Sequence, residues 1–320
     1  MRAFHSDDEL AVHLSEDEIS FVLSSSPDGA FIESSRYFDN YDLPCPVKVE
    51  VCEPSGQSKI VVLRKTRHGD LTLEAEVETT LSEIGLSVPA ILAGPKSGAL
   101  VVSYLPGEDL QHFSMRSAAH VQKAMSLLLD ALQTLERLTD KVESTSLAGQ
   151  LPKRTLIAEL EAISQSAPWA VNSTCESALA DLRPVIREID TPLTFTNGDY
   201  QPANFLTDGE VVTGFLDFED ACFRDPLMSI AKYPVYDLHP FNKAGFVDLY
   251  LRTGGFKSAD FAPRLALVCL ATLQREAPAP GESNAQDRYR THLLQLLDEA
   301  MAEIKRNGLN ADRPPTSILR

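Results

Sequence analysis

Three residues near position 200 have the types and the spacing of a phosphoryl-transfer site. Asp199, Asn204 and Asp217 fall within one stretch that starts at Thr196 and reads TNGDYQPANFLTDGEVVTGFLD. Two carboxylates and an amide offer the hard oxygen ligands that Mg²⁺ prefers. A carboxylate can also orient a substrate hydroxyl for attack on a phosphate. The stretch therefore predicts magnesium-dependent phosphoryl transfer.

A β-hairpin would bring the three side chains together. Asp208-Gly209 is a strong signal for a two-residue turn, and the residues on either side of it are apolar and suited to strands. With that turn, Thr207 would face Glu210. Continuing the register places Asp217 opposite Tyr200, beside the first carboxylate. The convergence needs no long-range folding assumption.

Each residue taken alone also has a purely structural explanation. A Gly-Asp pair is commonly a turn, and an Asn before a strand commonly hydrogen-bonds its own backbone. The combination favours the chemical interpretation, because it joins a five-residue spacing, a hairpin and a second carboxylate at the return of the hairpin.

The same stretch resembles a known family. NGDYQPAN followed by GFLDFEDACFRDP is similar to the H-G-D-x-x-x-x-N, hairpin, apolar-Asp-Phe and Asp-Pro pattern of the aminoglycoside phosphotransferase and choline kinase superfamily. The resemblance implies ATP as phosphate donor, Asp199 as the catalytic residue, and Asn204 and Asp217 as Mg²⁺ ligands. It implies a structural role for Asp225-Pro226. Asn197 stands where the family usually has His, and its amide could brace the loop instead.

The resemblance also implies a fold. It is α+β and two-lobed like that of protein kinases, with a small β-rich N-terminal lobe and a larger, mostly helical C-terminal lobe. The sequence pattern agrees, because alternating valines and a helical lead-in near Ser15 precede residue 106, whereas helical spacing dominates after it. We expect a nucleotide-binding lobe at 1–105, a lobe with the catalytic loop and acceptor site at 106–306, and a loose tail at 307–320. Helices are expected at 71–84, 121–138, 154–165, 176–189, 243–253, 261–275 and 285–305.

By the same resemblance, a strand cation steadies the donor phosphates. The strand that starts at Ile60 ends in Arg64 and Lys65. Alternation places these two on opposite faces, so only one can point into the cleft; Arg64 is the first choice and Lys65 the second. Glu74 lies where the family has the acidic partner of that cation, and the other glutamates of the same helix leave the choice open. The alternatives are a solvated strand end and an ordinary first-turn Glu.

The segment VSYLPG, residues 102–107, resembles the hinge of the family. There the backbone of Ser103 and Leu105 would meet the adenine edge; the alternative is a buried strand that runs into a turn. Kinase-like proteins usually have a glycine in the loop that covers the phosphates, but the candidate region from Ser34 to Pro46 has none. Close approach of backbone to phosphate is harder without glycine.

The composition disfavours some classes of partner and indicates the cellular location. The formal net charge of the 320 residues is −17, which disfavours a duplex nucleic acid partner, because binding phosphates needs clustered Lys and Arg. The five cysteines are scattered and odd in number, as in a reduced, cytoplasmic protein. The residues from Met1 to Leu14 lack the apolar core of a signal peptide, and no apolar run is long enough for a membrane span.

These observations predict a kinase for small molecules. It would use ATP and Mg²⁺ to move the γ-phosphate to a hydroxyl of a small polar acceptor such as an aminoglycoside, choline or a sugar. The alternative is a non-catalytic nucleotide-binding relative, a pseudokinase. Phosphorylation of proteins is disfavoured, because nothing in the sequence resembles a peptide-docking activation segment.

Overall fold

The computed structural model describes residues 11–38, 46–66, 70–165, 173–275 and 284–311. The chain divides into two compact units. Unit 1 comprises Met1–His112, Asp140–Leu151 and Pro202–Ala221, and unit 2 comprises Phe113–Thr139, Pro152–Gln201 and Cys222–Arg320. Most of the candidate phosphate-covering loop, residues 39–45, lies outside the described residues.

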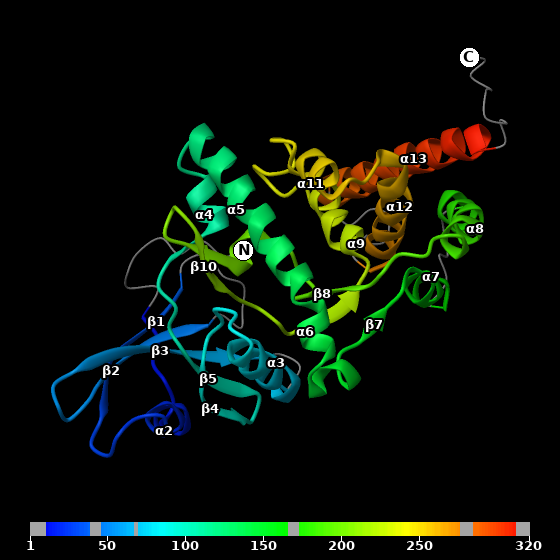
Figure 1. The fold of residues 1–320 in the computed structure, drawn as a ribbon. Helices are drawn as coiled ribbons and strands as arrows, with labels where there is room; N and C mark the ends of the chain where they lie inside the picture. The colour runs from blue at the N-terminus through cyan, green and yellow to red at the C-terminus, as the bar shows by residue number, and fades with distance from the viewer. Residues whose placement is uncertain (1–10, 39–45, 67–69, 166–172, 276–283, 312–320) are drawn as a thin grey trace, which may run out of the picture. The chain divides into compact units, whose positions relative to one another are not determined.

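Unit 1 is built on a five-stranded antiparallel sheet (Figure 1). Its strand order is β1-β2-β3-β5-β4, with β1 Phe31–Tyr37, β2 Val47–Cys52, β3 Ser58–Lys65, β4 Ile91–Lys96 and β5 Ala99–Ser103. Two helices accompany the sheet, α2 (Glu16–Leu23) and α3 (Thr72–Glu83). The predicted helix start at Ser15 is confirmed: its side chain and that of Glu18 form a reciprocal capping box.

The two faces of this sheet are covered by different elements. Val61 packs in a cluster with Val22 of α2, whereas its neighbour Val62 packs in a second cluster with Ala75 of α3. Side chains alternate between faces along a strand. Two residues after Val62, Arg64 therefore lies on the face that α3 covers.

A three-stranded sheet in unit 1 carries the candidate hairpin. Its order is β10-β9-β6, with β6 Glu108–Asp109, β9 Phe205–Thr207 and β10 Val212–Phe215. The 3₁₀ turn η2 (Pro202–Asn204) leads into β9. The hairpin exists, but the predicted register is wrong: Thr207 pairs with Val212 and, after a bulge, Phe205 pairs with Phe215.

The longer turn has a local cause. The Asp208 carboxylate accepts hydrogen bonds from two backbone N–H groups across the loop, at 2.9 and 3.0 Å, and so closes a wider loop than Asp-Gly alone would form. Beyond the ladder, the N–H of Leu216 donates to the carbonyl of Asn204 at 2.9 Å. Asp217 therefore follows beside Asn204, not at the position that the two-residue turn predicts.

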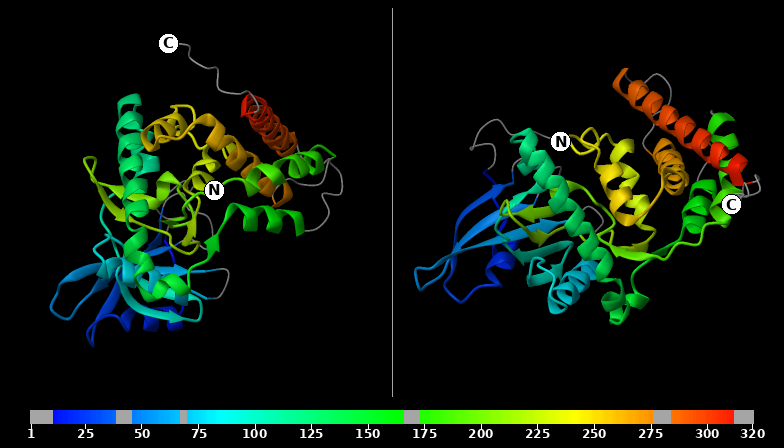
Figure 2. Two further views of the ribbon diagram at one scale, coloured as in Figure 1. Left: turned by 45° about the vertical axis from the view of Figure 1, so that its right-hand side comes forward. Right: turned by 45° about the horizontal axis from the view of Figure 1, so that its top comes forward.

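Unit 2 is mainly helical. Its small sheet has the order β7-β11-β8, and β8 leads directly into the Asp199 loop. Helices α12 and α13 lie side by side in both views of Figure 2. The strands are β7 Lys153–Arg154, β8 Thr194–Thr196 and β11 Cys222–Arg224, and the helices are α5 Ala118–Arg137, α7 Leu156–Gln165, α8 Ser173–Arg187, α9 Pro226–Ile230, α10 Lys232–Val235, α11 Phe246–Gly254, α12 Ser258–Arg275 and α13 Asn284–Ala311.

Short elements occur where the chain passes from one unit to the other, namely α4 Leu110–Ser114, α6 Thr139–Glu143 and η1 Ser146–Gly149. Each of the seven helices expected from the sequence overlaps an observed helix, because apolar residues at helical spacing form the buried side of each. In the described part of the chain, no helix combines the length and the apolar character needed to cross a membrane.

Gly107, just before β6, cannot be replaced without strain. Its φ is +137°, and a Cβ there would lie 3.0 Å from Oγ1 of Thr213 and 3.2 Å from the carbonyl oxygen of Thr207. We expect Gly107→Ala to lower the free energy of unfolding by about 1–3 kcal/mol, measured by thermal denaturation. Gly149→Ala is the control, since nothing lies within 4 Å of its Cβ. Equal losses in the two variants would contradict this account.

Candidate active site

A buried ion cluster surrounds Arg64 in unit 1. Its guanidinium contacts the carboxylate of Glu74 at 2.5 Å and that of Glu78 at 2.9 Å. The two glutamates are one turn apart on α3, so they project from the same side of the helix. Both are buried, with 3% and 0% of their surface exposed. Asp217 lies 3.9 Å from the same guanidinium. The cluster thus joins β3, α3 and the residue that follows the hairpin.

Burial and charge shift the pKa values in this cluster. Burial raises the pKa of Glu78 to about 7, although Arg64 acts in the opposite direction. Burial also raises the pKa of Glu74. For Arg64, burial alone would lower the pKa, but the charges of Glu74, Glu78 and Asp217 raise it above its ordinary value. The guanidinium therefore stays charged, whereas burial opposes the ionisation of the α3 carboxylates and Arg64 favours it.

Asp217 has an unusual backbone conformation. Its φ is +61°, in the left-handed region that Asp tolerates better than most residues with a side chain. The neighbouring backbone N–H of Phe218 donates to the Glu74 carboxylate, which ties this segment to α3. Strained backbone positions cluster at functional sites. The Asp217 side chain remains 37% exposed, so it is accessible to a ligand.

Asn204 and Asp217 carry the types of oxygen ligand that Mg²⁺ prefers. The hydrogen bond from the N–H of Leu216 to the carbonyl of Asn204 brings the backbone of Asp217 close to that of Asn204. Mg²⁺ usually takes one or two carboxylates and completes its shell with waters and substrate phosphates. Among the described residues, no group of three His, Cys, Asp or Glu is arranged to hold a metal by itself. The pair fits a metal ion that arrives with a phosphorylated substrate.

Asp199 lies in unit 2, in a loop held by its own side chains. Asn197 is 1% exposed, and its Oδ1 accepts a hydrogen bond from the N–H of Asp199 at 3.2 Å. The expected bracing of the loop by this amide is therefore observed. Lys232, at the start of α10, donates to the carbonyl oxygen of Gly198 at 3.0 Å and to Oδ1 of Asp199 at 3.2 Å. The sequence did not predict a role for Lys232, because no local sequence pattern indicates that the four-residue helix α10 contacts this loop.

The other residues predicted to bind the donor lie in unit 1. Lys65 points away from Arg64, as alternation predicts, and forms an ion pair with Glu18 of α2. The N–H of Ser103 donates to the carbonyl of Ala90 at 2.8 Å, and its Oγ accepts from the N–H of Ala90 at 2.8 Å. The Leu105 side chain covers Gly214 of β10, where a Cβ would approach it to 2.9 Å.

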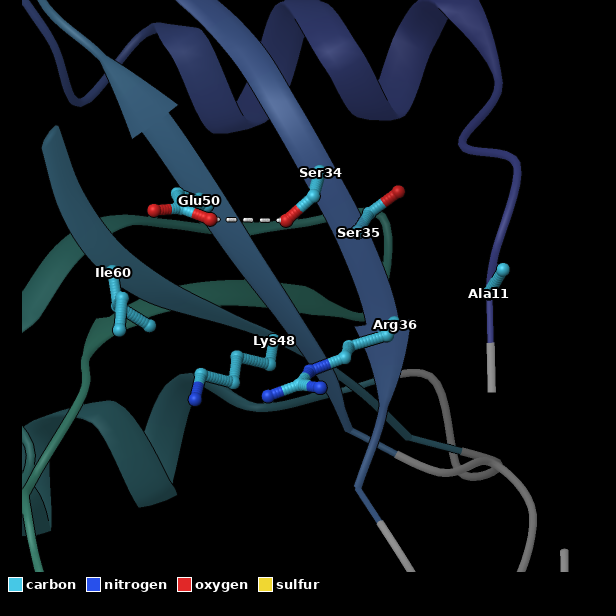
Figure 3. Close-up of a pocket in the computed structure, with 7 residues that line it drawn as sticks. All are labelled: Ala11, Ser34, Ser35, Arg36, Lys48, Glu50 and Ile60. Atoms are coloured by element: carbon cyan, nitrogen blue, oxygen red, sulfur yellow. Dashed lines mark hydrogen bonds between the residues drawn. The ribbon is translucent and has the colours of Figure 1, made fainter. Parts of the chain in front are cut away.

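An open pocket of about 400 Å³ lies on the sheet of unit 1 (Figure 3). It is lined by Ala11, Ser34, Ser35, Arg36, Lys48, Glu50 and Ile60. Lys48 pairs with Val62 across the strands, so its side chain lies on the same face as that of Arg64. Its ammonium is 4.8 Å from the centre of the Tyr104 ring, in the hinge-like segment.

Two cations of this pocket stand directly opposite each other. Arg36 and Lys48 are cross-strand partners in β1 and β2, and their side chains extend side by side in Figure 3. Like charges in that arrangement destabilise a sheet. Neither forms an ion pair with another described residue, and Glu50, the carboxylate among the lining residues, accepts a hydrogen bond from Ser34 at 3.2 Å. The pocket therefore favours an anionic ligand.

Comparison with known proteins decides the family. The sequence profile of the "Phosphotransferase enzyme family" matches residues 48–265, which is more than half of the chain. The chain belongs to this phosphotransferase family. The family resemblance read from the sequence is confirmed. No curated protein sequence matches the chain.

Solved structures similar to this phosphotransferase establish its fold. One is a thermostable mutant of aminoglycoside phosphotransferase APH(4)-Ia in a ternary complex with AMP-PNP and hygromycin B, with a TM-score of 0.63, 11% identity, and coverage of 89% of this chain and 98% of that one. Another is the GDP and kanamycin complex of APH(2")-IIia, with a TM-score of 0.60, 15% identity, and 90% and 99% coverage. A choline/ethanolamine kinase family protein from Mesorhizobium loti has a TM-score of 0.60, 16% identity, and 91% and 99% coverage. The predicted α+β, kinase-like fold is confirmed.

The raised pKa of Glu78 predicts a pH-dependent effect of its replacement. The folded pKa of about 7 exceeds the ordinary value of 4.5, so the folded state binds more protons between these values and wild-type stability falls as the pH rises through that window. Glu78→Gln removes this penalty, which reaches about 3 kcal/mol when Glu78 is fully ionised in the fold. We expect the melting temperature of Glu78→Gln relative to wild type to increase between pH 5 and pH 8. A difference that stays flat or decreases would contradict the assignment.

Proposed function

We propose that this phosphotransferase uses ATP and Mg²⁺ to transfer the γ-phosphate to a hydroxyl of a small polar molecule. The observation that carries the proposal is the buried Arg64–Glu74–Glu78 cluster with Asp217 at its edge and Asn204 beside Asp217. A fixed cation next to two oxygen ligands meets the need of phosphoryl transfer for positioning and charge stabilisation.

Each residue then has a defined task. Asn204 and Asp217 would hold Mg²⁺, which when bound neutralises charge on the donor phosphates. Arg64, fixed by Glu74 and Glu78, would orient those phosphates. Asp199 would accept the proton of the acceptor hydroxyl or orient that hydroxyl.

The open pocket on the Arg64 face is the proposed donor side. Arg36 and Lys48 supply positive charge there, and Tyr104 connects the pocket with the hinge-like segment. Ser103 and Leu105 flank Tyr104 and are the residues whose backbone we propose to meet the adenine. Lys65 is the weaker candidate for a phosphate contact, because its ammonium is engaged by Glu18 on the opposite face.

The acceptor is proposed by analogy with the similar structures. Those proteins were solved with hygromycin B or kanamycin, and another belongs to a choline/ethanolamine kinase family. A net charge of −17 suits a cationic acceptor of this kind. We further propose the nucleotide-binding lobe at 1–105, the acceptor lobe at 106–306, and a cytoplasmic location, which the four free cysteines among the described residues support.

The non-catalytic alternative rests on two departures from the family pattern, the lack of glycine in the candidate phosphate-covering loop and Asn197 in place of His. Most of that loop lies outside the described residues, and the Asn197 amide braces the Asp199 backbone. Phosphoryl transfer needs a positioned carboxylate, the role proposed for Asp199, and does not need a titratable group at position 197.

Replacement of Asp199 tests the proposal. ADP release is measured with ATP, Mg²⁺ and a panel of aminoglycosides, choline, amino alcohols and sugars. With the acceptor that supports turnover, we expect Asp199→Asn to lower kcat by roughly 10²–10⁴-fold and to leave the KM for ATP nearly unchanged, because the carboxylate acts on the hydroxyl.

Asp248→Asn, on the exposed side of α11, is the matched control and should retain wild-type turnover. Full activity of Asp199→Asn would contradict the assigned role. Binding of ATP and Mg²⁺ without turnover of any acceptor would instead support the non-catalytic alternative.

A further inference from the structure

Two consecutive residues of α10 bind three consecutive residues of the Asp199 loop. Lys232 donates to the carbonyl oxygen of Gly198 at 3.0 Å and to Oδ1 of Asp199 at 3.2 Å. Tyr233 donates from its hydroxyl to the carbonyl oxygen of Tyr200 at 2.7 Å. The side chains of Lys232 and Asp199 are only 25% and 23% exposed, so water and salt screen this pair less than an ordinary surface pair.

The aromatic core of unit 2 fixes the base from which Lys232 extends. Tyr233 is fully buried, and its ring centroid lies 4.9 Å from that of Phe246 and 6.4 Å from that of Phe241. These edge and tilted contacts hold α10 in one orientation. Lys232 therefore reaches the loop from a rigid support.

The Asp-Pro motif leads the chain to this support. Asp225 caps α9 by accepting a hydrogen bond from the N–H of Leu227 at 2.9 Å, and Pro226 occupies the first turn of that helix. The same carboxylate forms a buried ion pair with Arg264 of α12 at 2.6 Å. Asp225 thus anchors the α9 segment, and α10 follows it directly.

We propose that Lys232 is a positioning residue for phosphoryl transfer, a role that rests on the proposed function. The terminal torsion of an Asp side chain is broad and roughly two-fold, so the carboxylate is not fixed by its rotamer alone. A charge-assisted bond from Lys232 to Oδ1 selects one orientation of Asp199. The bond to Gly198 holds the adjacent backbone at the same time. Together they determine where the carboxylate meets the acceptor hydroxyl.

The kinetic test compares Lys232→Met, Lys232→Arg and a control. Because misplacement of a catalytic group by about 1 Å can cost on the order of 100-fold in rate, we expect Lys232→Met to lower kcat by roughly 10- to 100-fold, with the KM for ATP within about two-fold of wild type. Lys232→Arg should recover part of kcat, since it keeps the charge. Lys243→Met, at an exposed position after α10, should match wild type. A kcat of Lys232→Met within about two-fold of wild type would overturn the proposal.

A second measurement does not depend on turnover. Acylation of lysines by an amine-specific reagent is followed by mass spectrometry in wild type and in Asp199→Asn. Loss of the carboxylate partner should increase the labelling rate of Lys232 several-fold and leave that of Lys243 unchanged. An unchanged rate at Lys232 would show that the pair does not exist in solution and would refute the positioning role. A protected Lys232 in a chain that turns over no acceptor would refute the proposed function, and the positioning role with it.

Discussion

A guanidinium placed on a buried sheet face must be surrounded by carboxylates, and in unit 1 this requirement determines how β3, α3 and the hairpin meet. Arg64 is satisfied by Glu74 and Glu78, and these buried glutamates are tolerable only because Arg64 is present. The cluster therefore couples β3 to α3, and the Phe218 N–H and Asp217 couple the hairpin to both. Two carboxylates for one cation leave little net positive charge for a polyphosphate. We propose that Mg²⁺, the exposed Arg36 and the half-buried Lys48 supply the remainder.

Unit 2 uses the same kind of interaction around Asp199, the carboxylate that we propose acts on the acceptor hydroxyl. Its surroundings provide an amide, a backbone turn and one cation, Lys232. The buried pair of Asp225 and Arg264 joins α9 to α12, and α10, which carries Lys232, follows α9 directly. In both units, ion pairs therefore hold structural elements in place, since each pair joins elements that are distant in the sequence.

The sequence predicted the parts of the fold that depend on local pattern. The spacing of apolar residues predicted the helices, and the alternation of side chains along β3 predicted that Arg64 and Lys65 lie on opposite faces. Glu78 could not be singled out beside Glu76, because the choice depends on which side of α3 meets β3; in the structure Glu76 is exposed and Glu78 is buried. The hairpin turn was misjudged because the side chain of Asp208 closes a longer loop than the Asp-Gly pair indicates. Tertiary contacts such as that of Lys232 leave no local pattern from which they could be predicted.

We propose that Asn204 and Asp217 form a metal site next to a cation that the α3 carboxylates hold in place. A crystal structure with Mg²⁺ and a non-hydrolysable ATP analogue tests this proposal most directly. We expect Mg²⁺ bound by the Asn204 amide oxygen and an Asp217 carboxylate oxygen, with phosphate oxygens and waters as the other ligands and Arg64 still paired with Glu74. A metal ion bound elsewhere, or phosphates that contact neither residue, would contradict it.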